Sequence, residues 1–370
     1  MKRLNSKTQS IGAIINQAKL VLAGGGLVVY PTETTYGLGV MATNTQAVAK
    51  LLKYKTRRQG KPLSIAVANQ EMAQKYVQLN DQAKALYSSL LPGPVTVISK
   101  SLGKVAKGVA SEFGNLGIRW SNYPLVTNLV QALGKPITAT SANPSGQARP
   151  YSIDQLLKQL SAKQLTLIDL ILDAGPLPKN PPSTVIDTTL STPIVLRQGQ
   201  TKLKTNHLLQ TKSETETQEL AGKIMLQHWD DLIQQGLIIG LDGALGTGKT
   251  VFAKGIAKFL GITQHITSPT YTYIHSYDFN RHGVKGQLHH IDVWKVDSSE
   301  MADKLKLKSL IRPRSILVIE WFDQVAKYLE PVIKNRKVKL TRVQISEKSK
   351  LNQEIDNSIL INTHRWFALE

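Results

Sequence analysis

One short segment, residues 243–250, restricts the possible folds of this chain most strongly, because it matches the pattern G-x-x-x-x-G-K-[ST] in full. The apolar run at residues 237–241 before it has the length of a buried strand. Residues 251–260 after it repeat apolar side chains at helical spacing and end at Gly261, a typical helix C-cap. A strand, a glycine-rich loop and a helix N-terminus together direct backbone N–H groups and a helix dipole toward a polyphosphate. A glycine-rich turn could match by chance, but these flanks favour a nucleotide site.

The residue types within this loop predict separate roles. Lys249 would reach the β- and γ-phosphates of ATP, and the Thr250 hydroxyl would be a ligand of Mg²⁺. We expect the ATP-binding residues of the loop to be Gly243, Gly246, Thr247, Gly248, Lys249 and Thr250. ATP and Mg²⁺ are therefore the cofactors that the sequence predicts.

The composition is typical of an ordinary soluble protein. With 370 residues, 41% hydrophobic and 19% charged, the chain is long enough for two domains with separate cores. Its longest apolar runs are far short of about 20 residues, so we expect no transmembrane helix and no membrane partner. Residues 1–6 lack the apolar core of a signal peptide. The chain has no cysteine, which excludes disulfides and thiolate metal sites and suits a cytoplasmic location.

The bulk property that says most about partners is the charge. A formal net charge of +20 and an isoelectric point near 9.9 favour a polyanionic partner such as nucleic acid or nucleotides. A source organism with generally Lys-rich proteins would give the same composition. The charge by itself does not separate these two explanations.

The N-terminal half carries polar turns and cations at the ends of short predicted strands. A buried strand at residues 27–30 runs into a Thr- and Gly-rich turn at residues 31–39, at the sheet edge where α/β proteins bind ligands. Residues 55–63 are basic and join a helix to a strand, where phosphates could be held, although such runs are usually solvated. The polar loop at residues 135–146 could bind phosphate or ribose, or could be a plain Asn-Pro-Ser-Gly turn. No nucleophile–base pair is evident in this half, so its chemistry would rest on cations and hydroxyl groups.

Over about residues 10–200 these segments, in this order, resemble the YrdC/TsaC family of L-threonylcarbamoyl-AMP synthases. The motifs that carry the resemblance are Pro-Thr-Glu-Thr-Thr-Tyr-Gly-Leu-Gly at 31–39, Lys55-x-Arg57, Pro-Gly-Pro-Val-Thr at 92–96, Arg119, Thr-Ser-Ala-Asn at 140–143, Pro-Ser-Thr at 182–184 and Leu-Arg-x-Gly at 196–199. The resemblance implies a YrdC-like α/β domain with a twisted mixed sheet. It also implies an enzyme that joins L-threonine, bicarbonate and ATP and releases pyrophosphate.

The resemblance also assigns roles to residues. It puts Lys55, Arg57, Ser141, Asn143 and Arg197 on ATP or its adenylate, with the first four as catalytic residues. It puts Thr32, Lys61, Arg119 and Ser183 at positions for threonine and its carbamoyl group. Threonine carbamate and the α-phosphate are both anions, so their reaction needs cations to suppress repulsion. Asn115 and Arg149 depart from the family, because relatives often have hydroxyl residues there, and we assign them no role.

A second set of motifs follows the glycine-rich loop. Together with that loop, Ser-Pro-Thr-Tyr at 268–271, His-Ile-Asp at 290–292 and Glu-Trp at 320–321 resemble the TsaE family of small P-loop ATPases over about residues 213–345. The resemblance implies that Thr250 and Glu320 hold Mg²⁺, that Asp292 supports hydrolysis and that Thr270 lies in a nucleotide-sensing switch. A surface carboxylate at a strand end is the alternative for either acid.

Three further positions in this half bear on the site. His289 and His290 are adjacent, so a strand would point them to opposite faces, and we expect both to be structural. Ala244 replaces a usual Asp within the loop, and Trp294-Lys295 replaces a Tyr-Arg pair. The second change keeps aromatic and cationic character at that position.

We therefore expect a synthase domain at residues 1–205, a linker at 206–213, and a P-loop NTPase α/β domain with a basic tail at 214–370. Both families serve the formation of N6-threonylcarbamoyladenosine on tRNA. The resemblance implies a separate TsaD/TsaB-like transferase complex as protein partner, and contact with tRNA either directly or through that complex. The alternative is a basic RNA-binding module whose nucleotide sites regulate its affinity.

Overall fold

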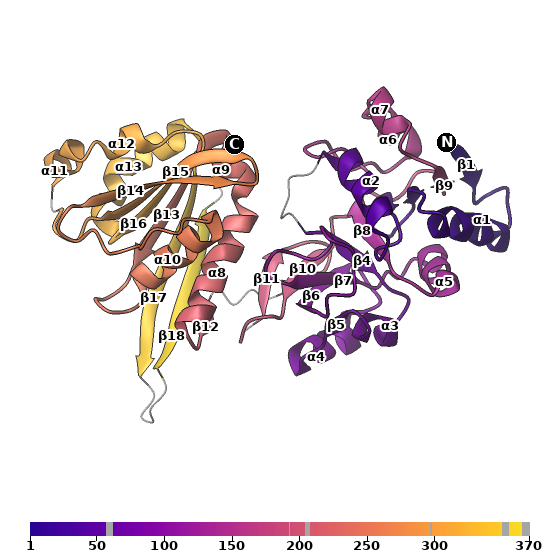
Figure 1. Cartoon of the computed structure of the whole chain (residues 1–370), viewed down its shortest axis with the longest axis horizontal. Helices are drawn as coiled ribbons and strands as arrows, with labels where there is room; N and C mark the ends of the chain where they lie inside the picture. The colour runs from indigo at the N-terminus through magenta and orange to yellow at the C-terminus, as the bar shows by residue number, and fades with distance from the viewer. Residues whose placement is uncertain (57–61, 192, 204–207, 297, 350–354, 365–370) are drawn as a thin grey trace. The chain divides into compact units, whose positions relative to one another are not determined.

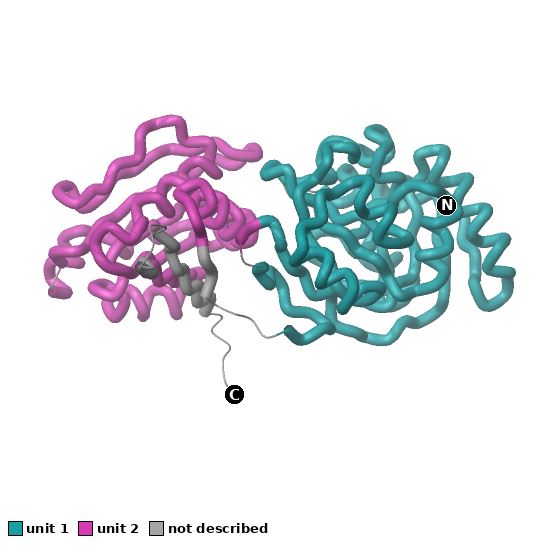
Figure 2. The backbone as a smooth tube through the Cα atoms, turned by 90° about the horizontal axis from the view of Figure 1, so that it is seen from below, with its two compact units in different colours: residues 1–189, 193–205 teal, residues 190–192, 206–370 magenta. Residues whose placement is uncertain are grey.

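The computed structural model divides the chain into two compact units (Figure 1, Figure 2). Unit 1 comprises residues 1–189 and 193–205, and unit 2 comprises residues 190–192 and 206–370. The structure describes residues 1–56, 62–191, 193–203, 208–296, 298–349 and 355–364.

Unit 1 is built on a mixed sheet with the strand order β1-β9-β2-β3-β8-β4-β7-β6-β10-β11, and β5 pairs with β6 beside this path. Its strands are β1 (Lys2–Asn5), β2 (Val28–Tyr30), β3 (Gly37–Gly39), β4 (Ser64–Ala66), β5 (Val77–Gln78), β6 (Val95–Ser101), β7 (Asn115–Arg119), β8 (Ile137–Ser141), β9 (Leu170–Asp173), β10 (Thr184–Asp187) and β11 (Ile194–Arg197). The sheet contains both parallel pairs, such as β4 with β7, and antiparallel pairs, such as β3 with β8. The predicted mixed-sheet α/β class is confirmed.

Helices cover both faces of this sheet (Figure 1). They are α1 (Ile11–Ala23), α2 (Thr45–Lys55), α3 (Gln70–Gln74), α4 (Asp81–Leu90), α5 (Pro124–Leu133), α6 (Ile153–Lys158) and α7 (Ala162–Leu165). Successive side chains of a strand point to opposite faces. Leu27 and Val29 therefore join a core with α2, α4 and α6, whereas Val28 and Tyr30 join a second core with α1 and α5.

Unit 2 has a seven-stranded sheet with the order β12-β18-β17-β13-β16-β15-β14. Its strands are β12 (Leu208–Thr211), β13 (Leu237–Asp242), β14 (Ile274–Arg281), β15 (Val284–Asp292), β16 (Ser315–Glu320), β17 (Lys339–Ser349) and β18 (Ile355–His364). Strands β17, β13, β16 and β15 run parallel to one another. Their carboxyl ends therefore meet at one edge, which is where open α/β sheets bind ligands.

Helices cover the unit 2 sheet as well: α8 (Glu214–Gln227), α9 (Trp229–Gln235), α10 (Lys249–Leu260), α11 (Ser299–Lys304), α12 (Leu307–Leu310) and α13 (Asp323–Asn335). Helices α8 and α10 pack closely because Gly255 has no side chain, and a Cβ there would lie 2.6 Å from the Gln218 Cα. Helices α11, α12 and α13 share another core with β16. Within the described ranges, no helix has the length and apolar character needed to cross a membrane.

The expected linker differs from the structure. Residues 208–211 form β12, which pairs antiparallel with β18, and the Ser213 side chain caps α8. Composition could not reveal this strand, because its partner lies about 150 residues later and backbone pairing needs no apolar pattern. The basic tail supplies β17 and β18.

Candidate active sites

In unit 1, the turn between β2 and β3 presents three threonine hydroxyl groups at the sheet edge. Thr32 is buried, and its Oγ1 donates to the Thr35 carbonyl oxygen at 2.6 Å and lies 3.1 Å from the Thr34 Oγ1. The Thr35 hydroxyl donates to the Pro150 carbonyl oxygen at 2.6 Å, which fixes the chain beyond residue 146 against this turn. The predicted threonine-site residue Thr32 therefore lies in a rigid, hydrogen-bonded turn.

Arg119 at the end of β7 reaches the same turn. Its Nη2 donates to the Thr34 Oγ1 at 3.0 Å and to the Glu33 Oε1 at 2.5 Å. The Arg119 and Glu33 side chains are each only 12% exposed, so this ion pair is largely shielded from water. Ser121 donates to the other oxygen of Glu33, Oε2, at 2.5 Å.

A second arginine is connected to Arg119 through strand pairing. Arg119 lies opposite Thr96 on β6, and the Thr96 Oγ1 is 3.1 Å from the Oγ of buried Ser183. Arg197 at the end of β11 donates from Nη2 to that Ser183 Oγ at 2.9 Å and from Nε to the Ser183 carbonyl oxygen at 3.0 Å. The structure thus brings together Thr32, Arg119, Ser183 and Arg197, which lie far apart in the sequence.

The cations of this group repel one another. Desolvation by surrounding protein atoms, and then the charges of Arg149 and Arg119, lower the pKa of Arg197 to about 10. Arg149 is exposed and forms no hydrogen bond or ion pair with any described residue. Relatives often have a hydroxyl residue at this position, so the arginine in this chain adds a positive charge near Arg197.

Lys55 holds the segment that we expected to be one polar loop at residues 135–146, of which residues 137–141 form strand β8 instead. Lys55 is 4% exposed, and its Nζ donates to the Ser141 carbonyl oxygen at 2.9 Å and to the Asn143 carbonyl oxygen at 2.6 Å. The Asn143 Nδ2 donates to the Gln147 carbonyl oxygen at 2.6 Å, and its buried Oδ1 has no partner among the described residues. An unpaired buried acceptor is costly, so this oxygen is suited to a ligand donor such as a ribose hydroxyl or an amino group.

Two of the predicted site residues of unit 1 cannot be placed, and Asn115 lies away from the site. Arg57 and Lys61 lie outside the described residues. Asn115 lies at the end of β7 opposite from Arg119, and its Nδ2 donates to the Thr189 Oγ1 at 3.4 Å. It therefore lies at the far end of β7 from the arginine group.

In unit 2, the glycine-rich loop joins β13 to α10. Gly243, Gly246 and Gly248 have φ values of +150°, +85° and +96°, which favour glycine, and a Cβ on Gly243 would lie 2.2 Å from the Ile345 carbonyl oxygen. Helix α10 begins at Lys249, so its free N–H groups face the loop. This is the strand–loop–helix geometry expected of a phosphate site.

The ammonium group of Lys249 lies inside the loop. It donates to the carbonyl oxygens of Gly243 at 2.9 Å and Ala244 at 2.8 Å, and it lies 4.2 Å from the centre of the Trp321 ring. Burial lowers the pKa of Lys249, while the carboxylates of Glu320 and other acids oppose that shift. The Thr247 hydroxyl donates to the Ala244 carbonyl oxygen at 2.9 Å and so shapes the loop rather than pointing away from it.

Thr250 and Glu320 form the candidate Mg²⁺ site. The Thr250 hydroxyl donates to the Glu320 Oε1 at 2.9 Å, and the His290 Nε2 lies 2.9 Å from the same oxygen. Glu320 Oε2 has no hydrogen bond within the described part of the chain. The described residues contain no group of three His, Cys, Asp or Glu side chains that could hold a metal alone. Two oxygen ligands fit Mg²⁺, which also takes phosphate and water ligands.

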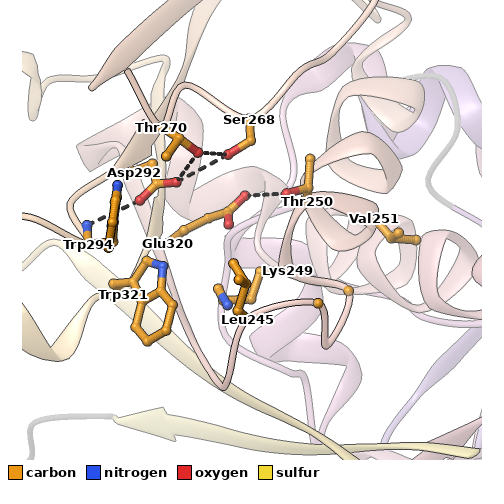
Figure 3. Close-up of a pocket in the computed structure, with 12 residues that line it drawn as sticks. Leu245, Lys249, Thr250, Val251, Ser268, Thr270, Asp292, Trp294, Glu320 and Trp321 are labelled. Carbon is orange, nitrogen blue, oxygen red and sulfur yellow. Dashed lines mark hydrogen bonds between the residues drawn. The ribbon is translucent and has the colours of Figure 1, made fainter. Parts of the chain in front are cut away.

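Asp292, at the end of β15, lies opposite Glu320 in the strand register. Its Oδ2 accepts hydrogen bonds from Ser268 at 3.1 Å and from Thr270 at 2.9 Å, and its Oδ1 accepts one from the Trp294 N–H at 3.1 Å. Asp292 thereby connects the Ser-Pro-Thr-Tyr segment to the site (Figure 3).

A pocket of about 570 Å³ unites these residues, and this volume is typical of small-molecule sites. Figure 3 shows Lys249, Thr250, Asp292 and Glu320 around it, with the side chains of Trp294 and Trp321 at its side. The lining residues are Leu245, Gly246, Gly248, Lys249, Thr250, Val251, Ser268, Thr270, Asp292, Trp294, Glu320 and Trp321.

Sequence reasoning missed several residues at the two sites. It gave no role to Glu33, Ser121 or Trp321, although all three lie within or beside quoted motifs. It expected His289 and His290 to be structural. His289 meets Ser276 at 2.8 Å, whereas fully buried His290 contacts the proposed Mg²⁺ ligand Glu320.

Comparisons with known proteins agree with this description. The Sua5/YciO/YrdC family model, described as "Telomere recombination", matches residues 20–199, and the model "Threonylcarbamoyl adenosine biosynthesis protein TsaE" matches residues 211–355. A putative threonylcarbamoyl-AMP synthase of Methanocaldococcus jannaschii is 33% identical over 186 residues, which are 50% of this chain and 86% of the relative. The threonylcarbamoyl-AMP synthase of Vibrio campbellii is 32% identical over 186 residues, covering 50% and 97%.

A solved structure shares the fold. A doubly substituted variant of P. abyssi Sua5 has a TM-score of 0.52 at 19% identity and covers 92% of this chain and 98% of that one. The chain therefore belongs to the Sua5/YciO/YrdC family of threonylcarbamoyl-AMP synthases, and it carries a TsaE domain, a P-loop ATPase domain, in its second half. Both matches assign it to the biosynthesis of threonylcarbamoyladenosine in tRNA.

Proposed function

We propose that unit 1 synthesises L-threonylcarbamoyl-AMP from L-threonine, bicarbonate and ATP. The amine nitrogen of threonine bonds to the bicarbonate carbon, and water leaves to give a carbamate. A carbamate oxygen then bonds to the α-phosphorus of ATP, the bond from that phosphorus to the bridging oxygen breaks, and pyrophosphate leaves. The relatives' name supports this reaction, and they match over half of the chain.

The observation that carries this proposal is the set Thr32, Arg119, Ser183 and Arg197, which hydrogen bonds and strand pairing connect. Strand β8 pairs with β3 next to the threonine turn, with Ser141 opposite Gly37. Both reacting partners are anionic, so cations fixed in advance lower the barrier without reorganising during the reaction. The nucleophile and the leaving group both belong to the substrates, so the protein need not supply a catalytic nucleophile.

Within this site we assign roles as the motifs suggest. Thr32, Arg119 and Ser183, together with Lys61, bind threonine and its carbamoyl group, and Arg119 supplies the charge for a carboxylate. The residues proposed for ATP and its adenylate are Lys55, Arg57, Ser141, Asn143 and Arg197, of which the first four are catalytic. The bonds of Lys55 to loop carbonyls support a role in shaping the nucleotide site.

We propose further that unit 2 hydrolyses ATP at its P-loop. Its nucleotide contacts would be Gly243, Gly246, Thr247, Gly248, Lys249, Thr250 and Thr270. Thr250 and Glu320 would hold Mg²⁺, which supplies charge for the phosphates, while Asp292 assists hydrolysis and links the site to the switch at Thr270. The geometric support is that Asp292 and Glu320 end adjacent parallel strands next to the loop.

The two units would serve one pathway from a cytoplasmic location. The proposed domain limits are 1–205 and 214–370. The adenylate is unstable by nature, since it is a mixed anhydride, so it must pass to a transferase. We propose a TsaD/TsaB-like complex as that partner, with unit 2 supporting its turnover. The charge of +20 supports contact with tRNA, directly or through that complex.

Pyrophosphate release with and without L-threonine tests the proposed synthase activity. The wild-type chain, given ATP and bicarbonate, should release pyrophosphate and form the adenylate only when threonine is present. Threonine-independent pyrophosphate release would contradict the proposal. Tight, salt-sensitive tRNA binding with no synthase activity would support the RNA-binding alternative instead.

A further inference from the structure

Glu33 carries the carboxylate that pairs with Arg119 in the candidate site of unit 1. Its Oε1 accepts from the Arg119 Nη2 at 2.5 Å, and its Oε2 accepts from the Ser121 Oγ at 2.5 Å. The Ser121 residue is 3% exposed, and its own position is fixed because its Oγ accepts from the Tyr123 N–H at 3.1 Å. Both carboxylate oxygens of Glu33 are therefore engaged by protein groups.

The backbone of Glu33 is held as well. Asn180 donates from Nδ2 to the Glu33 carbonyl oxygen at 2.8 Å, and the Tyr151 hydroxyl donates to the Asn180 carbonyl oxygen at 3.1 Å. The neighbouring Thr34 meets the same Arg119 Nη2. Main chain and side chain thus fix the carboxylate from several directions.

This arrangement uses only part of the Arg119 guanidinium. Both of its side-chain hydrogen bonds leave from Nη2, and within the described residues Nε and Nη1 donate to none. A guanidinium binds a carboxylate best through two parallel N–H donors, which requires a fixed guanidinium plane. In Arg119 the two Nη2 donors are taken by Glu33 and Thr34, and Nε and Nη1 point along different edges of the guanidinium, so each unused donor can give one charge-assisted hydrogen bond to an α-amino acid carboxylate.

Stability alone is a weak reason for this ion pair. Its two side chains are each 12% exposed, and a pair removed from water to that extent loses in hydration much of what it gains by attraction. A geometric and electrostatic role explains the arrangement better than a stabilising one.

We propose that Glu33 is a positioning residue, which with Ser121 fixes the Arg119 guanidinium so that its remaining donors bind the carboxylate of the amino-acid substrate. Glu33 acts through Arg119 and does not itself touch the substrate. The inference rests on the proposed function, since it takes threonine to be the ligand of Arg119.

The test compares Glu33→Gln, Ser121→Ala and a control, Lys50→Met. Lys50 forms an ion pair of the same 2.5 Å length with Asp169 in unit 1, but it takes no part in the site. Calorimetric titration with L-threonine and ATP, and pyrophosphate-release kinetics, would be measured on the full chain. Glu33→Gln removes the charge and keeps the shape of the side chain. It should weaken threonine binding and raise the KM for threonine about tenfold, while ATP affinity stays within about twofold of wild type.

Ser121→Ala should weaken threonine binding about threefold, and adding it to Glu33→Gln should cause no further loss, because both act on one carboxylate. Glu33→Asp should restore part of the affinity, and Lys50→Met should leave both ligands unaffected. Wild-type threonine affinity in Glu33→Gln and Ser121→Ala would overturn the inference, as would equal losses for threonine and ATP in both. A wild-type chain that binds no threonine would overturn the proposed function itself.

Discussion

The candidate site of unit 2 takes its anion-binding groups from one continuous segment, whereas that of unit 1 takes them from several distant ones. The loop at residues 243–250 offers backbone N–H groups and a helix N-terminus, with Lys249 folded into it. The unit 1 site instead gathers Arg119 and Arg197 from two strands and places hydroxyl groups between them. Anions can thus be held by backbone dipoles or by fixed side-chain charges, and the two solutions respond differently to mutation.

The largest effect should follow from neutralising Glu320. Glu320→Gln keeps the shape of the side chain but removes the negative charge of the carboxylate. That carboxylate accepts a hydrogen bond from Thr250 and would attract Mg²⁺. We expect ATP hydrolysis to phosphate to fall about 100-fold, in the range of a lost transition-state interaction. Threonine-dependent pyrophosphate release should stay within about twofold of wild type. A parallel loss of both activities would show that the two sites are coupled.

Arg197→Gln should have a smaller effect, and it should reduce the activity of unit 1 rather than that of unit 2. The glutamine amide can still donate to the Ser183 oxygen, so the change mainly removes a cation from the unit 1 site. Adenylate synthesis should fall about 30-fold, because one fixed charge no longer faces the anions. Phosphate release by unit 2 is the internal control and should not change. Full synthase activity would mean that Arg197 lies beside the site without serving it.

His290→Asn should have a milder effect on unit 2. The asparagine amide can donate to Glu320 only with altered geometry, so the carboxylate is oriented less well. We expect ATP hydrolysis to fall about fivefold, as for a weakened supporting hydrogen bond. The matched control is His289→Asn, which alters the contact with Ser276 and should leave hydrolysis unchanged. Equal effects of the two variants would argue against the Glu320 contact.

The smallest effect should be a dependence on alkaline pH. Desolvation by burial, and then the positive charges of Arg149 and Arg119, lower the pKa of Arg197 to about 10. Its charge is therefore present below that pH and is lost as pH rises through it. In a Lys249→Ala background, ATP affinity of unit 1 should fall about twofold between pH 8 and pH 10, where half of Arg197 would be neutral. Arg197→Gln should lack this component. The same slope in both variants would contradict the assignment.

The same contrast explains what the sequence could predict. The strand, loop and helix around residues 243–250 agree with β13 and α10 because the motif and the apolar periodicity are local. The mixed sheet of unit 1 followed from a resemblance spread over seven motifs. Strand β12 was not predicted, because its partner β18 lies far away in the sequence.

Side-chain direction was the other limit. Adjacent His289 and His290 look equivalent in the sequence, and only the pairing of β15 with β16 turns one of them toward Glu320. Glu33 lies in a quoted motif, but its contact with Ser121 spans 88 residues and has no local signal. Arg149 gained significance only through its proximity to Arg197.

The central claim is that the chain has two separate ATP-using sites. The most direct test measures pyrophosphate and phosphate release side by side in Lys249→Ala, supplied with ATP, bicarbonate and L-threonine. The removed ammonium group would otherwise contact the β- and γ-phosphates at the P-loop. We predict threonine-dependent pyrophosphate release at the wild-type rate, with phosphate release reduced to background. Loss of pyrophosphate release in this variant would contradict the claim.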